Sequence, residues 1–67
     1  MNGNEFIKKV KRLGKDNDIE VRLEQQRGKG SHATLYYGDK YTIVKDRKKE
    51  IGKGLYKAMM KQLGIEE

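Results

Sequence analysis

The chain has 67 residues, of which 34% are hydrophobic and 39% are charged. A chain of this length supports one small domain at most, and we expect residues 1–67 to form a single domain with a small core. Cysteine is absent, which excludes disulfide bonds and cysteine-bound metal as sources of stability. No apolar run exceeds three residues, whereas a membrane-spanning helix needs about 20. We therefore expect a soluble, cytoplasmic protein with no membrane partner.

The formal net charge is +6, from 16 Lys and Arg against 10 Asp and Glu. Such a charge favours a polyanionic partner, with nucleic acid first and an acidic protein surface second. Many small proteins are basic for solubility alone, so composition leaves that alternative open. The placement of the charges along the chain has to decide between them.

An amphipathic helix is expected first, at about residues 4–13. Asn2 precedes Glu5 by three residues, which is the spacing of a capping box at a helix start. We expect Gly14 to end the helix in a left-handed conformation. The apolar residues that recur at helical spacing are Phe6, Ile7, Val10 and Leu13.

A strand is expected at residues 19–26, where apolar and polar side chains alternate. Ile19, Val21 and Leu23 then share the inner face, and Arg22 with Glu24 lies on the outer one. The glycine-rich residues 27–31 that follow indicate a loop.

Two further strands are expected at residues 32–37 and 40–44, joined by a two-residue turn at Gly38-Asp39. Glycine suits the positive φ at the first position of such a turn. Alternation in the middle strand assigns its side chains to two faces. Ala33, Leu35 and Tyr37 are expected to point inward, and His32, Thr34 and Tyr36 outward.

A charged connector at residues 45–50 leads into a second helix at about 52–63, which Gly64 is expected to end. The expected apolar stripe consists of Ile51, Leu55, Met59 and Leu63, widened by Tyr56 and Met60. Beside it runs a row of lysines, Lys53, Lys57 and Lys61.

The element order α-β-β-β-α predicts an α+β fold. A three-stranded antiparallel sheet with one apolar face, and two helices that each have an apolar stripe, indicate that both helices pack on the same face of the sheet. The other sheet face is then open to solvent or a ligand. This arrangement resembles the double-stranded-RNA-binding domain, a likeness of fold that does not by itself assign a function.

His32 is the only histidine and is the first candidate for chemistry. An imidazole can take or give a proton near neutral pH. In the loop before it, Lys29 and Ser31 offer a charge and a hydroxyl to a phosphate. The alternatives are a partly exposed strand histidine and a plain hairpin loop, because the loop fits neither a P-loop nor a dinucleotide fingerprint. No second histidine or cysteine completes a metal site, so we expect neither a metal nor another cofactor.

Basic and aromatic residues suggest a surface for RNA. Lys48, Lys49 and Lys53 can contact the phosphate backbone, although a solvated charged face is the alternative. Among the tyrosines we favour Tyr36, an outward ring that can stack on an unpaired base. Tyr37 and Tyr41 are expected to pack in the core or the hairpin.

Three segments together resemble the HicA family of toxin-antitoxin modules. They are EFIKKV at residues 5–10, GKGSH at 28–32 and GLYKAMMKQLGI at 54–65. The likeness extends over about residues 3–65. At Ala33 the chain departs from many members, which carry a polar residue or a second histidine after the motif histidine.

The resemblance implies a ribosome-independent endoribonuclease that cleaves mRNA and is inhibited by a HicB-type antitoxin. It also implies the fold expected above, and it assigns the catalytic role to His32. Our hypothesis is metal-independent cleavage in which His32 is the general acid or base. Lys29 or Arg22 would stabilise the charged phosphorane, and Tyr36 or water would serve as the second proton carrier. The alternatives are a non-catalytic RNA-binding module of the same fold and an adaptor for an acidic protein.

Overall fold

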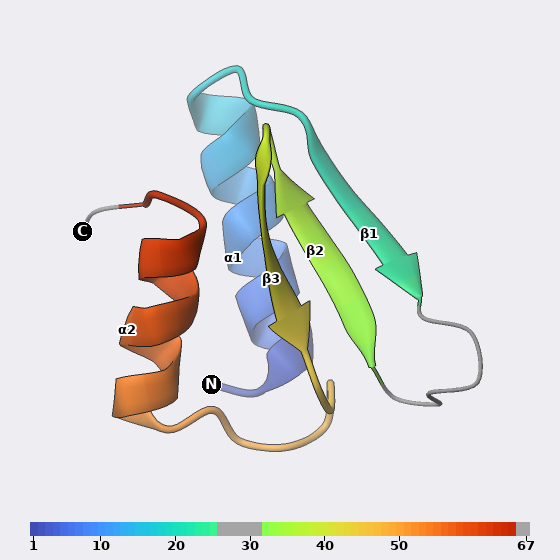
Figure 1. Ribbon diagram of the computed structural model, residues 1–67, viewed down its shortest axis with the longest axis vertical. Helices are drawn as coiled ribbons and strands as arrows, with labels where there is room; N and C mark the ends of the chain where they lie inside the picture. The colour runs from blue at the N-terminus through green and yellow to red at the C-terminus, as the bar shows by residue number, and fades with distance from the viewer. Residues whose placement is uncertain (26–31, 66–67) are drawn as a thin grey trace.

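The computed structural model describes residues 1–25 and 32–65. Its elements follow the order α-β-β-β-α (Figure 1), and the strands form an antiparallel sheet in the order β1-β2-β3. This confirms the predicted α+β fold. The elements are α1 (Gly3–Asp16), β1 (Val21–Gln25), β2 (Ala33–Tyr37), β3 (Lys40–Val44) and α2 (Lys53–Gln62).

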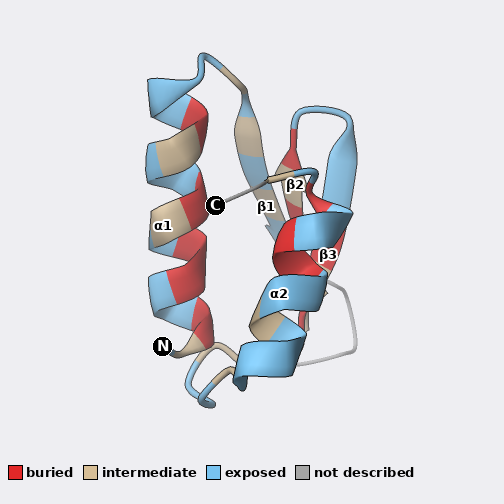
Figure 2. Ribbon diagram, turned by 90° about the vertical axis from the view of Figure 1, so that its left-hand side faces the viewer, coloured by how far each residue is buried: buried red, intermediate tan, exposed pale blue. Residues whose placement is uncertain are grey.

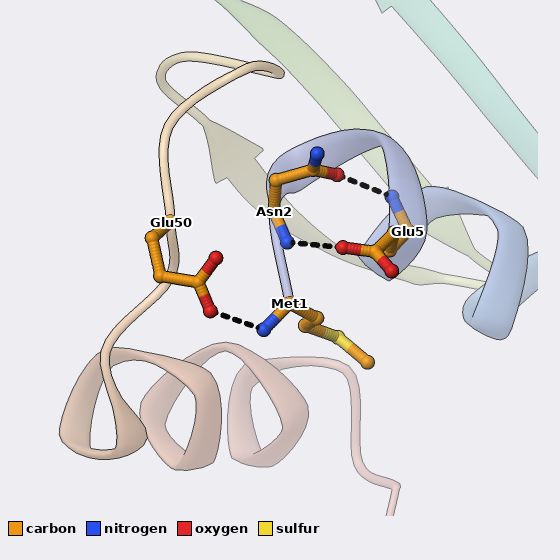
Figure 3. Close-up of polar contacts among 4 residues, drawn as sticks. All are labelled: Met1, Asn2, Glu5 and Glu50. Carbon is orange, nitrogen blue, oxygen red and sulfur yellow. Dashed lines mark hydrogen bonds and ion pairs between the residues drawn. The ribbon is translucent and has the colours of Figure 1, made fainter.

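The start of α1 is held by the predicted capping box (Figure 3). Asn2 Oδ1 accepts a hydrogen bond from the Glu5 backbone N–H, and Glu5 Oε1 accepts one from the Asn2 N–H, each at 2.9 Å. Two donors exposed at the helix start are thereby satisfied. The Met1 amine donates to Glu50, and this hydrogen bond raises the pKa of the amine above its usual value. The connector before α2 is therefore attached to the start of α1.

The end of α1 differs from the prediction, because the helix continues through Gly14 to Asp16. Gly14 is buried inside the helix, and a β-carbon there would overlap Val21 Cγ2 and lie 2.8 Å from the Ile19 carbonyl oxygen. The glycine thus permits close approach of the chain that enters β1, and it does not adopt a left-handed conformation. That conformation occurs at Asp18, with φ of 57°.

Both helices contribute to one core on the inner face of the sheet. Figure 2 shows the buried side of α1 turned toward the sheet, with α2 beside β3. The predicted turn is confirmed, since Gly38 has φ of +63°. The buried core residues are Phe6, Ile7, Val10, Leu35, Tyr37, Val44, Met59, Met60 and Leu63.

The predicted apolar stripe of α2 is only partly buried. Met59, Met60 and Leu63 lie in the core, whereas Leu55 is 54% exposed. In Figure 1 the first turn of α2 lies beyond the end of β3. As predicted, Gly64 ends the helix, with φ of +71°. Over residues 1–25 and 32–65, neither helix has the length and hydrophobicity to cross a membrane.

Candidate functional site

His32 lines a groove of about 360 Å³ between the end of β3 and the start of α2. The histidine is half-buried, so the groove gives a ligand access to it. The other residues that line the groove are Ile43, Val44, Lys45, Asp46, Lys49, Glu50, Ile51, Leu55 and Met59.

The β2-β3 hairpin explains how His32 and Lys45 come together. Ala33 pairs with Val44 in the antiparallel register. Continuing that register by one residue brings His32 opposite Lys45, and both side chains line the groove. Lys49, which the sequence predicted as an RNA-contacting residue, lines it as well. A proton carrier and two ammonium groups thus share one groove.

The groove also contains two carboxylates, and both are engaged elsewhere. Asp46 Oδ1 accepts a hydrogen bond from the Lys48 backbone N–H at 3.0 Å, and Glu50 pairs with the Met1 amine. Among residues 1–25 and 32–65, the ammonium groups of Lys45 and Lys49 form no ion pair. Their charge therefore remains available to an anionic ligand.

Part of the lining of the groove is apolar. Ile43 and Ile51 are half-buried, and Leu55 lines the groove from α2. Leu55 was expected to complete the core stripe, and its exposure follows from its position in the first turn of the helix. A groove that combines aliphatic side chains with two lysines can bind both the apolar and the charged parts of a ligand.

Arg22 and Tyr36 form a second group on the open sheet face. Arg22 pairs with Tyr36 across β1 and β2, and its guanidinium carbon lies 4.9 Å from the Tyr36 ring centre. Tyr36 follows His32 by four residues, or about 13 Å along an extended strand. The structure therefore does not bring Arg22 and Tyr36 to His32.

Tyr41 extends this second group: of the two predicted alternatives, core or hairpin packing, the structure shows the contact within the hairpin and not burial in the core. It pairs with Tyr36 in the register of β2 and β3, so the two rings share the open face. Their centres lie 6.0 Å apart, and Tyr41 is 58% exposed. The two-residue turn was the signal in the sequence that could have revealed this pair, because it fixes the partner of every strand residue.

The remaining predicted site residues are scattered. Lys48 is exposed in the connector, and Lys53 begins α2 beside a different hollow. Thr34, which is not a predicted site residue, shares a face of β2 with Tyr36, as expected from alternation, although only 8% of it is exposed. Lys29 and Ser31 lie outside the described residues.

A small basic α+β domain with a histidine and two lysines in one groove has the groups needed to act on a phosphodiester. The profile of the family described as HicA toxin of bacterial toxin-antitoxin matches residues 3–65, so the chain belongs to the HicA toxin family. A protein of Pseudomonas fluorescens (strain Pf0-1), named "Probable mRNA interferase HicA", is 44% identical over 46 residues. That match covers 67% of this chain and 77% of the relative. No solved structure gives a significant match.

Proposed function

We propose that this chain is the toxin of a toxin-antitoxin module and acts as an mRNA endoribonuclease with His32 as its catalytic residue. Its membership of the HicA family and the name of its relative support the activity. The observation that carries the catalytic assignment is the groove that His32 shares with Lys45 and Lys49.

In the proposed mechanism His32 acts as general base on the RNA 2′-hydroxyl. Its imidazole takes the hydroxyl proton as the 2′-oxygen attacks the adjacent phosphorus, the P–O5′ bond breaks, and a 2′,3′-cyclic phosphate forms. Lys45 and Lys49 stabilise the added negative charge on the phosphorane. Water protonates the leaving 5′-oxygen, because Tyr36 lies about 13 Å along the strand from His32. None of these steps requires a metal ion.

The proposed inhibitor is a HicB-type antitoxin that covers the same groove. Exposed Leu55 offers an apolar contact, and Lys45 and Lys49 attract an acidic segment. Charge complementarity of this kind mainly speeds the encounter of two proteins. An antitoxin bound there would exclude RNA from His32.

The decisive experiment incubates the purified chain with single-stranded RNA in the presence of a chelator. We expect cleavage by the parent protein and a loss of about 10²–10⁴-fold in rate for His32→Ala, with an unchanged circular dichroism spectrum. Activity retained by a folded His32→Ala protein would exclude the catalytic assignment. Salt-sensitive binding of duplex RNA without any cleavage would instead identify a non-catalytic RNA-binding module.

A modified substrate tests the route of the reaction separately. RNA with a 2′-deoxy substitution at the scissile nucleotide lacks the proposed nucleophile and is expected to resist cleavage. Its ready hydrolysis would exclude attack by the 2′-oxygen while leaving the role of His32 open to the first experiment.

A further inference from the structure

The open face of the sheet carries a row of planar side chains that the groove at His32 does not use. Arg22, Tyr36 and Tyr41 are register partners in consecutive strands, so the row crosses the whole sheet. Both helices contribute to the core on the opposite face. The row is therefore available to a ligand that approaches the sheet from its uncovered side.

Contacts within the row fix the orientation of its central ring. The Arg22 guanidinium lies 4.9 Å from the centre of the Tyr36 ring, and the Tyr41 ring centre lies 6.0 Å away on the other side, tilted by 48°. Tyr36 is half-buried between these neighbours. Because Tyr36 is held on both sides, the accessible aromatic surface is mainly that of Tyr41.

The ring of Tyr41 is accessible to a ligand. It is 58% exposed, whereas Tyr37, the adjacent residue to Tyr36 on the other face, is 7% exposed. Tyr41 also lines a hollow of about 410 Å³ at the β3 edge of the sheet, which extends from Asp39 to Ile43 and reaches Gln62 of α2. The hollow leaves room for a ligand beside the exposed Tyr41 ring.

We propose that Arg22, Tyr36 and Tyr41 form a stacking platform for an unpaired nucleobase of the RNA, with Tyr41 as the residue that contacts the base. This inference rests on the proposed ribonuclease function and narrows its substrate to RNA that is single-stranded at the bound base. Every base has an aromatic face, so such a platform accepts different sequences. A base inside a duplex is already stacked on both sides and cannot use it.

The platform and the groove are placed to hold the same strand. Tyr36 is separated from His32 by four residues of β2, or about 13 Å. A base on the platform would therefore belong to a nucleotide near the phosphate at His32 and not to the scissile nucleotide itself. The platform would set where along the strand the cut falls, and His32 would make it.

The test measures binding of a short single-stranded RNA to the His32→Ala protein, which cannot consume the ligand by the proposed chemistry. We expect Tyr41→Ala to weaken binding by roughly 5- to 150-fold, the range for loss of one aromatic stack on a base. Tyr41→Phe keeps the ring, so this variant, also made in the His32→Ala protein, is expected to bind RNA as tightly as the His32→Ala protein itself. The slope of affinity against salt is expected to stay unchanged in both variants, because no phosphate contact is removed.

A matched ligand lacks the base that Tyr41 is proposed to contact. An oligonucleotide of the same length with abasic ribose throughout is expected to bind the His32→Ala protein equally well with and without Tyr41→Ala. If the His32→Ala protein bound the normal RNA equally well with and without Tyr41→Ala, the proposed platform would be overturned. So would a loss of affinity that persists in full on the abasic strand.

A second measurement keeps Tyr41 in place, so its result does not depend on whether a Tyr41 variant folds. Ultraviolet cross-linking of the His32→Ala protein to the same RNA is expected to join a base to Tyr41, and cross-links confined to other residues would overturn the platform.

Failure of the proposed platform can be told apart from failure of the proposed ribonuclease activity. Cleavage by the parent with no effect of Tyr41→Ala rejects only the platform, whereas base-dependent binding without cleavage supports the platform and rejects only the nuclease.

Discussion

Gly14 of α1 and Val21 of β1 approach each other so closely that no β-carbon fits between them. Alanine normally stabilises a helix by about 0.5–1 kcal/mol over glycine. At Gly14 the added methyl group would meet both Val21 Cγ2 and the Ile19 carbonyl oxygen. Overpacking of this kind costs about 1–3 kcal/mol, so we expect Gly14→Ala to lower the free energy of unfolding. Urea unfolding followed by circular dichroism measures the change.

Gly54 in α2 provides the matched control, because a β-carbon there would meet no atom within 4 Å. Gly54→Ala is expected to raise the free energy of unfolding by about 0.5–1 kcal/mol through helix propensity alone. If Gly14→Ala were as stabilising as Gly54→Ala, the close approach of α1 and β1 would be contradicted.

Gly14 also shows why the sequence predicted the elements better than their ends. Apolar spacing predicted α1, and the Asn2 and Glu5 pair predicted its first turn, because both signals lie within a few residues of one another. A glycine, by contrast, suits a left-handed helix end and a close approach of two segments equally well. Only the position of Val21 in space decides between the two.

Leu55 in α2 and Leu63, the residue that caps the end of α2, test the corrected apolar stripe with the same substitution. Leu63 is 1% exposed, so Leu63→Ala is expected to cost about 2–5 kcal/mol through lost contacts and the cavity left behind. Leu55 is 54% exposed, so Leu55→Ala is expected to cost about 1 kcal/mol or less. Equal losses in urea unfolding would show that Leu55 is packed as deeply as Leu63.

Part of the candidate site could be predicted from the sequence, and part could not. The two-residue turn at Gly38-Asp39 fixes the register of β2 and β3, so it also places Tyr36 beside Tyr41 and brings His32 and Lys45 to the same end of the hairpin. The exposure of Leu55 was not readable, because its spacing matches that of the buried residues on the same helix. The exposure of Leu55 depends on where α2 begins relative to the end of β3. That position is set by tertiary packing and not by the spacing of residues in the helix.

The contact between Lys9 of α1 and Tyr56 of α2 gives a prediction about how the helices are joined. Lys9 Nζ donates to the Tyr56 hydroxyl at 2.7 Å, and the Tyr56 ring meets Phe6 edge to face at 5.9 Å. Tyr56→Phe removes only the hydroxyl and is expected to cost about 0.5–1.5 kcal/mol. Tyr56→Ala also removes the ring and is expected to cost more. Equal stability of parent and Tyr56→Phe in urea would show that the hydrogen bond contributes nothing.

Lys45 and Lys49 give the prediction that bears most directly on catalysis. Each lines the groove with His32, so Lys45→Ala and Lys49→Ala each remove a positive charge beside the proposed phosphorane. We expect each to lower the cleavage rate at saturating RNA, by up to about 10²–10³-fold for the lysine closer to the reacting phosphate. The plot of log affinity against log salt concentration is also expected to become less steep. For a single-stranded RNA its slope should change by about 0.7 for each phosphate contact that the substitution removes.

Lys11 is the control for these two variants, because it is exposed on α1 and does not line the groove. Lys11→Ala changes the net charge by the same amount and is expected to keep both the cleavage rate and the salt slope. Cleavage assays at several salt concentrations compare the three variants directly. If Lys11→Ala impaired cleavage as much as Lys45→Ala and Lys49→Ala, the lysines would act through overall charge, and the groove would have no special role in stabilising the phosphorane.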